Sequence, residues 1–423
     1  MKLHLSLGAI AASQLAASVV VQLVVVATLG IGGHTDALIA AQSATLVVLV
    51  VLSSALQNLW QPRLAILNLH PEKWRSALCT QQGQVLLLFG GVAGVMLASR
   101  RLWIGLLFPG FGFEQRAMTA TLVPPLLGAM FFGGHVALLA TAQRARDRFL
   151  GTEIASLLVS LGAIGAVAVL VPRYGVEAAA WTAFARAALA YGITFWLADR
   201  PIPSLMSGWR CSEVWRQLRP QIAVGSIYKS GPLVDRFWTS QAPVGAVSLF
   251  GLAQTAIGAF ATVLDRAICV PVVPQLARLA ESGDLVALRD QYRRCVLRVG
   301  LVSATIPLSL LCLHPLWGVL LRSTLHIGPA AAESIWLMCM LLTGYLFVGA
   351  AGSITAAAFY AIGDVRTPMM ISVIGFGFGL VVKSLAFVWL GLVGLALGTS
   401  LYYAINMAVM CLLLERKLDA RHS

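Results

Sequence analysis

Long uninterrupted runs of apolar residues are the feature that most constrains this chain. Hydrocarbon offers no hydrogen-bond partners, so a segment crossing a membrane must satisfy its own backbone groups as a helix or belong to a closed barrel. A helix needs roughly 20 apolar residues to cross about 30 Å, and about twelve such stretches can be recognised. They cover residues 5–30, 37–59, 78–97, 120–142, 149–171, 176–197, 220–241, 247–271, 297–317, 334–358, 368–389 and 391–414.

Composition supports the same class. Hydrophobic residues make up 59% of the chain and charged residues only 11%, with a mean hydropathy of +0.84. A soluble protein with a polar surface is therefore excluded, and we predict an all-α polytopic integral membrane protein. The first apolar stretch is too long for a signal-peptide core and is expected to remain as a spanning helix. The seven cysteines contain no C-x-x-C pair and are interpreted as packing residues.

The two halves of the chain share short patterns at matching spacings. Residues 41–44 (AQSA) correspond to residues 253–256 (AQTA), and each Gln precedes a proline, Pro62 or Pro274, by 20 positions. A second pair agrees, since Asp147 precedes Thr182, and Asp364 precedes Thr399, by 35 positions. Duplicated halves in an apolar chain are typical of transporters with a central site. We therefore predict two pseudo-symmetric six-helix lobes, residues 1–200 and 220–423, joined by a cytoplasmic linker at 201–219.

The basic residues are arranged by topology. The net charge is +13, but the Lys and Arg residues are spread among short loops, so we predict no nucleic-acid partner. With both termini in the cytoplasm, inner segments hold about four times as many Lys and Arg residues as outer loops. This bias predicts an N-in, C-in orientation. Four cytoplasmic arginines, Arg278, Arg289, Arg293 and Arg294, are suited to attracting anionic lipid headgroups, although the same bias alone explains them.

Signatures of enzymes and of bound cofactors are missing. The sequence contains no G-x-x-x-x-G-K-[ST] loop, H-E-x-x-H pair or G-x-S-x-G elbow. The longest segments between apolar stretches, near 198–219 and 272–296, are too short to hold an independent active site. We therefore predict a protein that is not an enzyme and needs no cofactor. Coupling to the membrane potential or to a monovalent cation is left open.

Lys229 is the leading candidate ligand-binding residue. An ionised side chain at the bilayer centre costs roughly 2.5 to 3.5 kcal/mol, so it needs a partner or a cavity. In a helix over 220–241, Lys229 would lie about 13 Å from the cytoplasmic end, close to the midplane. An anionic group such as a phosphate would suit it. A structural ion pair or a snorkelling amine is the alternative.

Other charged residues within the apolar stretches are weaker candidates. Asp235 and Arg236 follow Lys229, but adjacent helical residues point about 100° apart and pair poorly. At least one of them is expected to face a cavity or another helix. Arg186, halfway along its stretch, is included as a candidate, with a structural role as the alternative.

Several neutral polar positions are also candidates. Gln42 and Gln254 occupy equivalent places in the repeat and should lie near a pseudo-symmetry axis. Gln14, Ser18 and Gln22 form one stripe in the first stretch, suited either to lining a cavity or to hydrogen bonding between helices. Gly375, Gly377 and Gly379 lie within one apolar stretch, which favours close helix packing over phosphate binding.

Several motifs together resemble one family. Residues 30–37 (GIGGHTDA) resemble the G-x-x-x-x-T-D-A turn of the MurJ/MviN lipid flippases, and residues 108–111 (FPGF) resemble their P-G-F segment. Residues 234–236 (VDR) and 274–284 match further elements in order. The most specific match is residues 358–368 (AFYAIGDVRTP), which resemble the family's A-F-Y-A-x-G-D-x-R-T-P loop.

The resemblance implies a member of the multidrug/oligosaccharidyl-lipid/polysaccharide (MOP) exporter superfamily. It implies alternating access, a lipid-linked oligosaccharide as cargo, contact with membrane lipids and a monomeric state. Asp36, in the first motif, joins the candidate site residues on this ground.

The sequence also departs from that family. Family members carry arginines in the first two helices, whereas residues 5–30 and 37–59 contain no Lys or Arg. The arginine expected early in the eighth helix is absent, and two further helices of the family are not expected here. The preferred hypothesis is a flippase for another carrier-linked glycan, with Lys229 binding the anion. A cation-coupled drug antiporter and a non-transporting scaffold are the alternatives.

Overall fold

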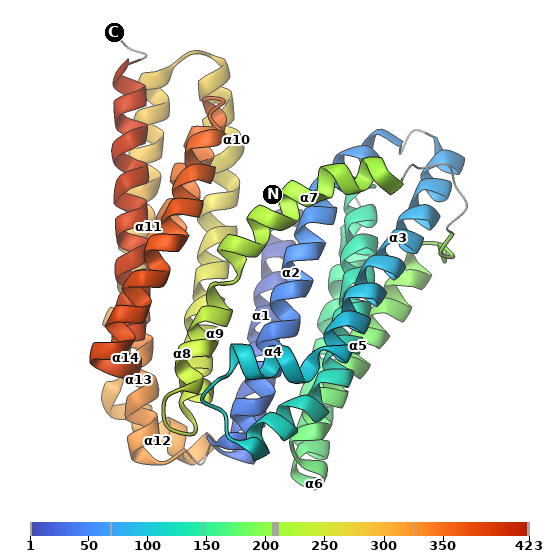
Figure 1. Cartoon of the computed structure of the whole chain (residues 1–423). Helices are drawn as coiled ribbons and strands as arrows, with labels where there is room; N and C mark the ends of the chain where they lie inside the picture. Colours follow the sequence, from blue (N-terminus) through green and yellow to red (C-terminus); the bar gives the residue numbers. More distant parts are fainter. Residues whose placement is uncertain (1, 68–69, 147, 205–210, 326, 421–423) are drawn as a thin grey trace. The chain divides into compact units, whose positions relative to one another are not determined.

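The computed structural model describes residues 2–67, 70–146, 148–204, 211–325 and 327–420, and every regular element in these ranges is helical. The chain forms two compact units, Met1–Ser248 and Leu249–Ser423. Eight of the described helices are long and apolar enough to cross a membrane. These features confirm the predicted all-α membrane class (Figure 1).

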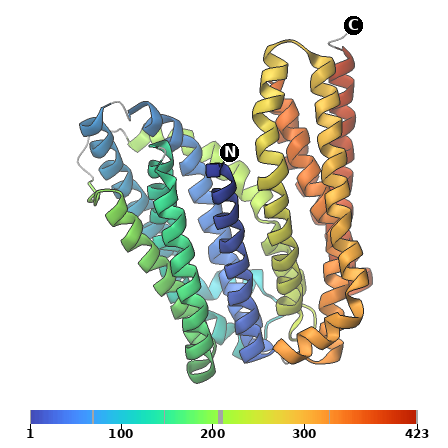
Figure 2. The ribbon, with the colours of Figure 1, turned by 180° about the vertical axis from the view of Figure 1, so that it is seen from behind.

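Eight helices lie in the first unit. They are α1 (Lys2–Leu29), α2 (Gly33–Leu67), α3 (Pro71–Ala98), α4 (Arg100–Leu107), α5 (Phe113–Ala145), α6 (Phe149–Leu197), α7 (Cys211–Lys229) and α8 (Gly231–Ser240). The pairs α2 and α5, α5 and α6, and α1 and α6 pack extensively. Figure 2 shows α1 in dark blue beside the green α6. The core contains fully buried aromatic side chains such as Trp60, Trp74 and Phe89.

The second unit contains most of α9 (Ala246–Leu264), followed by a π-helical turn (Asp265–Cys269) and α10 (Val270–Glu281). The remaining helices are α11 (Leu285–Cys312), α12 (His314–Leu325), α13 (Pro329–Ala361) and α14 (Arg366–Ala420). Helix α13 packs against α10, α11 and α14.

Two helices bend back on themselves at a glycine. Gly175 in α6 has a φ of 68°, and Gly391 in α14 has a φ of 59°, in the left-handed region that favours glycine. The two halves of α14 pack antiparallel. This follows from two contacts, since a Cβ at Gly379 would meet Tyr402 and a Cβ at Gly398 would meet Lys383. The close packing predicted for this glycine-rich segment is confirmed. Each bent helix accounts for two of the predicted apolar stretches.

One predicted stretch is divided between two helices in the structure, so the prediction of a single helix there is wrong. The apolar segment 220–241 is not one helix, because α7 ends at Lys229 and α8 begins at Gly231. Pro232 lies at the start of α8, where it lacks the N–H that would continue α7. Helix α7 also begins at Cys211, so residues 211–219 of the predicted linker are helical. The predicted division into lobes at 201–219 stays a prediction, and by compactness α7 and α8 belong to the first unit.

Candidate functional site

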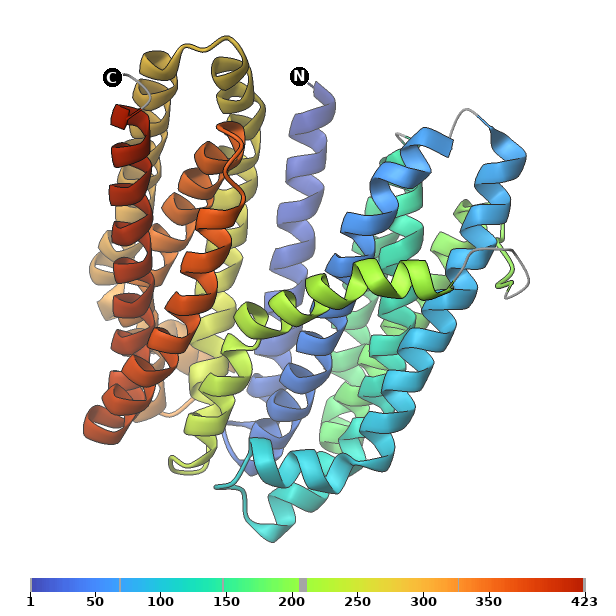
Figure 3. The same ribbon diagram turned by 45° about the horizontal axis from the view of Figure 1, so that its top comes forward.

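The candidate site is a row of three cations where α2 meets α7 and α8 within the first unit. Along this contact Arg236 pairs with Ser43, Lys229 with Ser54, and Arg63 with Gln217, so the helices run antiparallel. Figure 3 shows α7 crossing α2. Ser43 and Arg63 are 20 residues apart, or about 30 Å along the helix, close to the thickness of the hydrocarbon core. We call Arg63, Lys229 and Arg236 the cationic seam.

Lys229 occupies the break between two helices. It is the last residue of α7, and its Nζ donates hydrogen bonds to Ser54 Oγ and to the Val50 carbonyl at 3.4 Å. Its side chain is only partly buried. A hydroxyl and a backbone carbonyl of α2 thus accept hydrogen bonds from the ammonium.

Arg236 is the most deeply buried cation of the seam. Its side chain is 5% exposed, and its Nε donates to Ser43 Oγ at 3.1 Å. Its Nη1 is buried and has no hydrogen-bond partner among the described residues. The carboxylates of Asp235 and Asp36 are near enough to attract the guanidinium electrostatically. Arg236 therefore keeps donors suited to an oxyanion.

Asp36 ties the start of α2 to the start of α9. It is 1% exposed, and its Oδ2 accepts a hydrogen bond from the Gly245 N–H at 2.6 Å. Its Oδ1 accepts from the Ser248 N–H at 2.8 Å and from Ser248 Oγ at 2.5 Å. A carboxylate here satisfies N–H groups that the first turn of α9 leaves unpaired, and it complements the helix dipole. We call these three residues the Asp36 clasp, and the geometry gives Asp36 a structural role in it.

The turn before α2 explains part of the motif that contains Asp36. Thr35 Oγ1 accepts from the Gly32 N–H and lies 3.0 Å from the Gly30 carbonyl, which closes the turn. Gly245 has a φ of 96°, and a Cβ there would lie 2.8 Å from Ile31. Glycine at 245 is therefore required by both conformation and space.

The other predicted site residues are more scattered. Asp235 is buried on α8 next to Arg236, and Gln42 is half-buried on α2 next to Ser43. Arg186 is exposed on α6, away from the seam contacts. Gln254 is half-buried in the second unit. Their assignment to substrate binding stays a prediction, as it does for the seam residues.

Sequence reasoning missed several members of the site. Ser43, Ser54 and Ser248 lie in apolar helices, and their neighbours in sequence do not mark them as partners of a charge. Arg63 is one of the basic residues of the inner segments, and its sequence context indicates only the cytoplasmic charge bias. Its Nη2 in fact donates to Gln217 Oε1 at 2.6 Å, and its guanidinium lies 5.6 Å from the Trp60 ring. The sequence repeat is the signal that marks Ser43, because this serine lies inside the first repeated segment, residues 41–44.

The polar stripe on α1 is at least partly an interhelical contact. Gln14 Nε2 donates to the Glu153 backbone carbonyl at 2.7 Å, and Glu153 also pairs with Arg144 at 3.1 Å. The stripe therefore joins α1 to α6 at this end.

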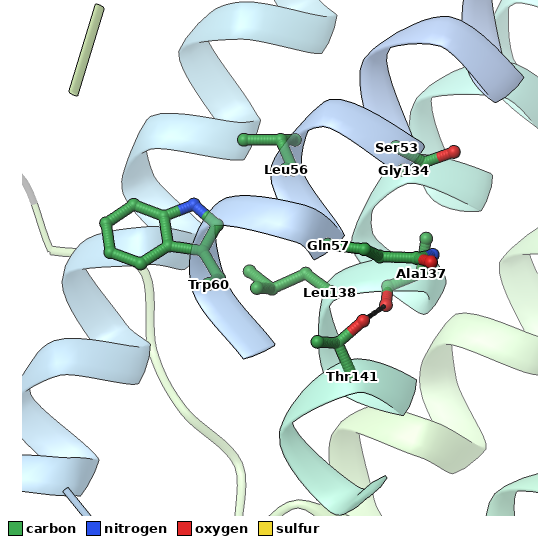
Figure 4. A pocket seen from close by; sticks show the side chains of 8 residues that line it. All are labelled: Ser53, Leu56, Gln57, Trp60, Gly134, Ala137, Leu138 and Thr141. Atoms are coloured by element: carbon green, nitrogen blue, oxygen red, sulfur yellow. Dashed lines mark hydrogen bonds between the residues drawn. The ribbon is translucent and has the colours of Figure 1, made fainter. Parts of the chain in front are cut away.

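A crevice between α2 and α5 is a packing gap. Figure 4 shows its lining by Ser53, Leu56, Gln57, Trp60, Gly134, Ala137, Leu138 and Thr141. It is too narrow for a water molecule. The Thr141 hydroxyl already donates to the Ala137 carbonyl. Among the described residues, no group of three or more His, Cys, Asp or Glu side chains could hold a metal ion.

The second unit carries an ordered loop between α13 and α14. Asp364 Oδ1 accepts from the Thr367 N–H at 3.0 Å, and Oδ2 accepts from Thr367 Oγ1 at 2.6 Å and from Lys417 Nζ. Burial raises the pKa of this carboxyl, but hydrogen bonds from Lys417 and Thr367 outweigh burial and hold the pKa well below its usual range. Asp364 thus anchors the start of α14 to its end.

Structural comparison defines the class of protein. The fold matches a lipid II flippase MurJ in an inward closed conformation, with a TM-score of 0.80, 15% identity and coverage of 98% of this chain and 88% of that one. It also matches an inward-facing MATE-family multidrug resistance transporter of the MOP superfamily, with a TM-score of 0.73, 14% identity and coverage of 99% and 95%. The chain therefore has the fold of the MOP transporters.

Sequence comparison identifies the family within that class. Residues 25–422 match the model of the family described as lipid II flippase MurJ, and the chain belongs to this family. A probable lipid II flippase MurJ of Synechocystis sp. is 22% identical over 360 residues, which cover 78% of this chain. The match spans 65% of that relative's length. Family and apolar helices together make this a multi-pass inner-membrane protein.

Proposed function

We propose that the protein is a flippase that moves a polyprenyl-pyrophosphate-linked saccharide across the bacterial inner membrane by alternating access. The observation that carries the proposal is the cationic seam, which distributes three positive charges over about 30 Å of helix α2. A pyrophosphate is a multiply charged anion with oxygens that accept from both ammonium and guanidinium donors. Membership of the MurJ family supports a lipid-linked cargo.

The placement of the charges supports a cargo other than the peptidoglycan precursor. Residues 5–30 and 37–59 contain no Lys or Arg. Two of the seam cations, Lys229 and Arg236, instead come from α7 and α8. We propose another carrier-linked glycan as the cargo, with the anionic linkage common to both. We further propose an N-in, C-in monomer that uses no cofactor.

A drug antiporter is the second candidate, and the fold shared with a MATE transporter favours it. Exchange of a cation for a drug requires an ionisable carboxylate that is free to change partners. Both oxygens of Asp36, the buried carboxylate at the start of α2, already accept hydrogen bonds from Gly245 and Ser248. This arrangement supports the flippase over the antiporter.

The test compares polyprenyl-linked lipids in a strain lacking the gene with those of its parent by mass spectrometry. We expect one carrier-linked glycan to accumulate in the deletion strain, and its mass identifies the cargo. Accumulation of the peptidoglycan precursor would show that Lys or Arg within residues 5–30 and 37–59 is not needed to move it. An unchanged set of carrier-linked lipids would overturn the flippase proposal.

A further inference from the structure

A polar pair joins α3 to α5 inside the first unit, apart from the cationic seam. His135 Nδ1 is hydrogen bonded to Gln82 Oε1, and the two side chains are 2% and 0% exposed. An amide oxygen only accepts, so Nδ1 carries the hydrogen and Nε2 carries a lone pair. His135 lies ten residues before the end of α5, about 15 Å along the helix axis.

Unpaired polar atoms belong to this pair and to the neighbouring residue Gln81. The Nε2 of His135, the Nε2 of Gln82 and both amide atoms of Gln81 are buried without a hydrogen-bond partner among the described residues. Gln81 is 1% exposed. Each buried unpaired group costs about 1 to 3 kcal/mol, so this concentration indicates that the native protein holds something there. The set mixes donors and acceptors, which suits water and a proton better than a metal ion.

Two aromatic rings pack against the imidazole. The ring centroid of Phe131 lies 4.9 Å from that of His135, and the Tyr191 ring centroid lies at 5.2 Å. A Cβ at Gly134 would lie 2.6 Å from Phe89, so α3 and α5 approach closely beside the pair. A change of charge at His135 therefore acts on a tight helix contact.

Several titratable groups lie on the helices packed against α5. Tyr191 on α6 faces His135, whereas Arg186 on the same helix is exposed. Helix α3 offers the neutral Gln82 at the ring and Cys79 three residues earlier. On α2, the carboxylate of Asp36 lies near the start of the helix and the guanidinium of Arg63 lies near its end. Among these described helices, no carboxylate is bonded to His135.

We propose that the Gln82–His135 pair is a proton-binding site that couples transport to the proton gradient. A proton from water joins the Nε2 lone pair, and the resulting imidazolium keeps its Nδ1–H bond to Gln82. A water molecule would accept from the new Nε2–H. The coupling rests on the proposed transport function, whereas the proton site itself does not.

The first experiment measures protonation without any cargo. The full chain is labelled with ¹⁵N-histidine, placed in nanodiscs and titrated by solid-state NMR, with the His135 signal identified by its loss in His135→Gln. We expect both ring nitrogens to move to imidazolium shifts as the pH falls, and the transition to move to higher pH in Gln82→Glu. A His135 that stays neutral throughout, or a Gln82→Glu variant with an unshifted transition, would overturn the proton site.

The second experiment measures coupling in proteoliposomes that contain the accumulated carrier-linked lipid. A pH gradient should accelerate its translocation, and His135→Gln should remove that acceleration while leaving the basal rate within about twofold. His34→Gln, which removes an exposed imidazole, should behave as the parent. Acceleration that persists in His135→Gln would overturn the coupling. No translocation by the parent, with His135 still titrating, would overturn the proposed function and leave the proton site standing.

Discussion

At the scale of single residues, Lys229 places a charge at the end of a helix. Its Nζ donates hydrogen bonds to a hydroxyl and a carbonyl of α2. The proposed function depends on the three residues of the cationic seam. Substituting them tests whether they bind a ligand.

The Lys229→Ala variant should lose complementation of a strain lacking the gene. A charge-assisted hydrogen bond to a phosphate is worth about 1.5 to 3 kcal/mol, which is a loss of about tenfold or more. Lys229→Arg should retain part of the activity. Arg216→Ala, on the exposed face of the same helix, serves as the control. Normal complementation by Lys229→Ala at equal membrane abundance would remove Lys229 from the proposed site.

Asp364 should make stability depend on pH. Its pKa is lower in the folded protein than the value of about 3.9 in an unfolded chain. Its contribution is therefore complete above the unfolded pKa and is lost as the pH falls through the folded pKa. Asp364→Ala should melt several degrees lower than the parent at pH 7, and the gap should narrow below about pH 4. Thermal unfolding in detergent at several pH values checks this, and a gap independent of pH would contradict it.

At the scale of elements, glycines allow helices to pack closely, and the buried carboxylate of Asp36 connects two helices by hydrogen bonds. The antiparallel halves of α14 approach where glycine removes a side chain, as at Gly379 beside Tyr402. The Asp36 clasp performs the corresponding task for α2 and α9. Both arrangements predict large effects from small substitutions.

The Gly379→Ala variant should be destabilised by about 1 to 3 kcal/mol, since the added Cβ would lie 2.5 Å from the Tyr402 ring. Gly377→Ala is the matched control, because a Cβ at that position meets nothing within 4 Å. The melting temperatures of the two purified variants provide the measurement. Equal melting temperatures of the two variants would show that the Tyr402 ring moves aside without a loss of stability.

The Asp36→Ala variant distinguishes a structural clasp from a ligand. Loss of the carboxylate leaves the N–H groups of Gly245 and Ser248 without their acceptor, at about 1 to 3 kcal/mol for each buried group. We expect reduced thermal stability, with a smaller loss of the same kind in Ser248→Ala. Unchanged stability together with lost transport would instead assign Asp36 to the cargo.

The helices could be predicted from the sequence where a long run of apolar residues marks them. The spanning segments and the bends near Gly175 and Gly391 follow from long apolar runs broken at short polar or glycine positions. The break at Ser230 was missed although Gly231 and Pro232 mark it, because the apolar run continues through them. Pairings such as Lys229 with Ser54 join residues 175 positions apart, and nothing local in one sequence encodes that distance.

At the scale of the whole molecule, the distribution of Lys and Arg predicts the orientation. In intact cells, a single cysteine replacing Ser282 should be protected from a membrane-impermeant maleimide, and one replacing Glu114 should react. Both positions are exposed in loops or first turns, so burial alone cannot explain a difference. The background must lack the seven native cysteines. The reverse labelling pattern would contradict the N-in, C-in orientation.

The bend at Gly391 has a consequence for how the protein is made. Residues 385–398, which surround the bend, include no charged side chain, so the turn at the bend carries no charge across the membrane when the two halves of α14 insert. The translocon can accept these halves as one hairpin, and their orientation then depends on Arg366 before them and on Arg416 and Lys417 after them. The last two crossings are thus oriented from their outer ends, by residues that emerge from the ribosome before and after the apolar hairpin.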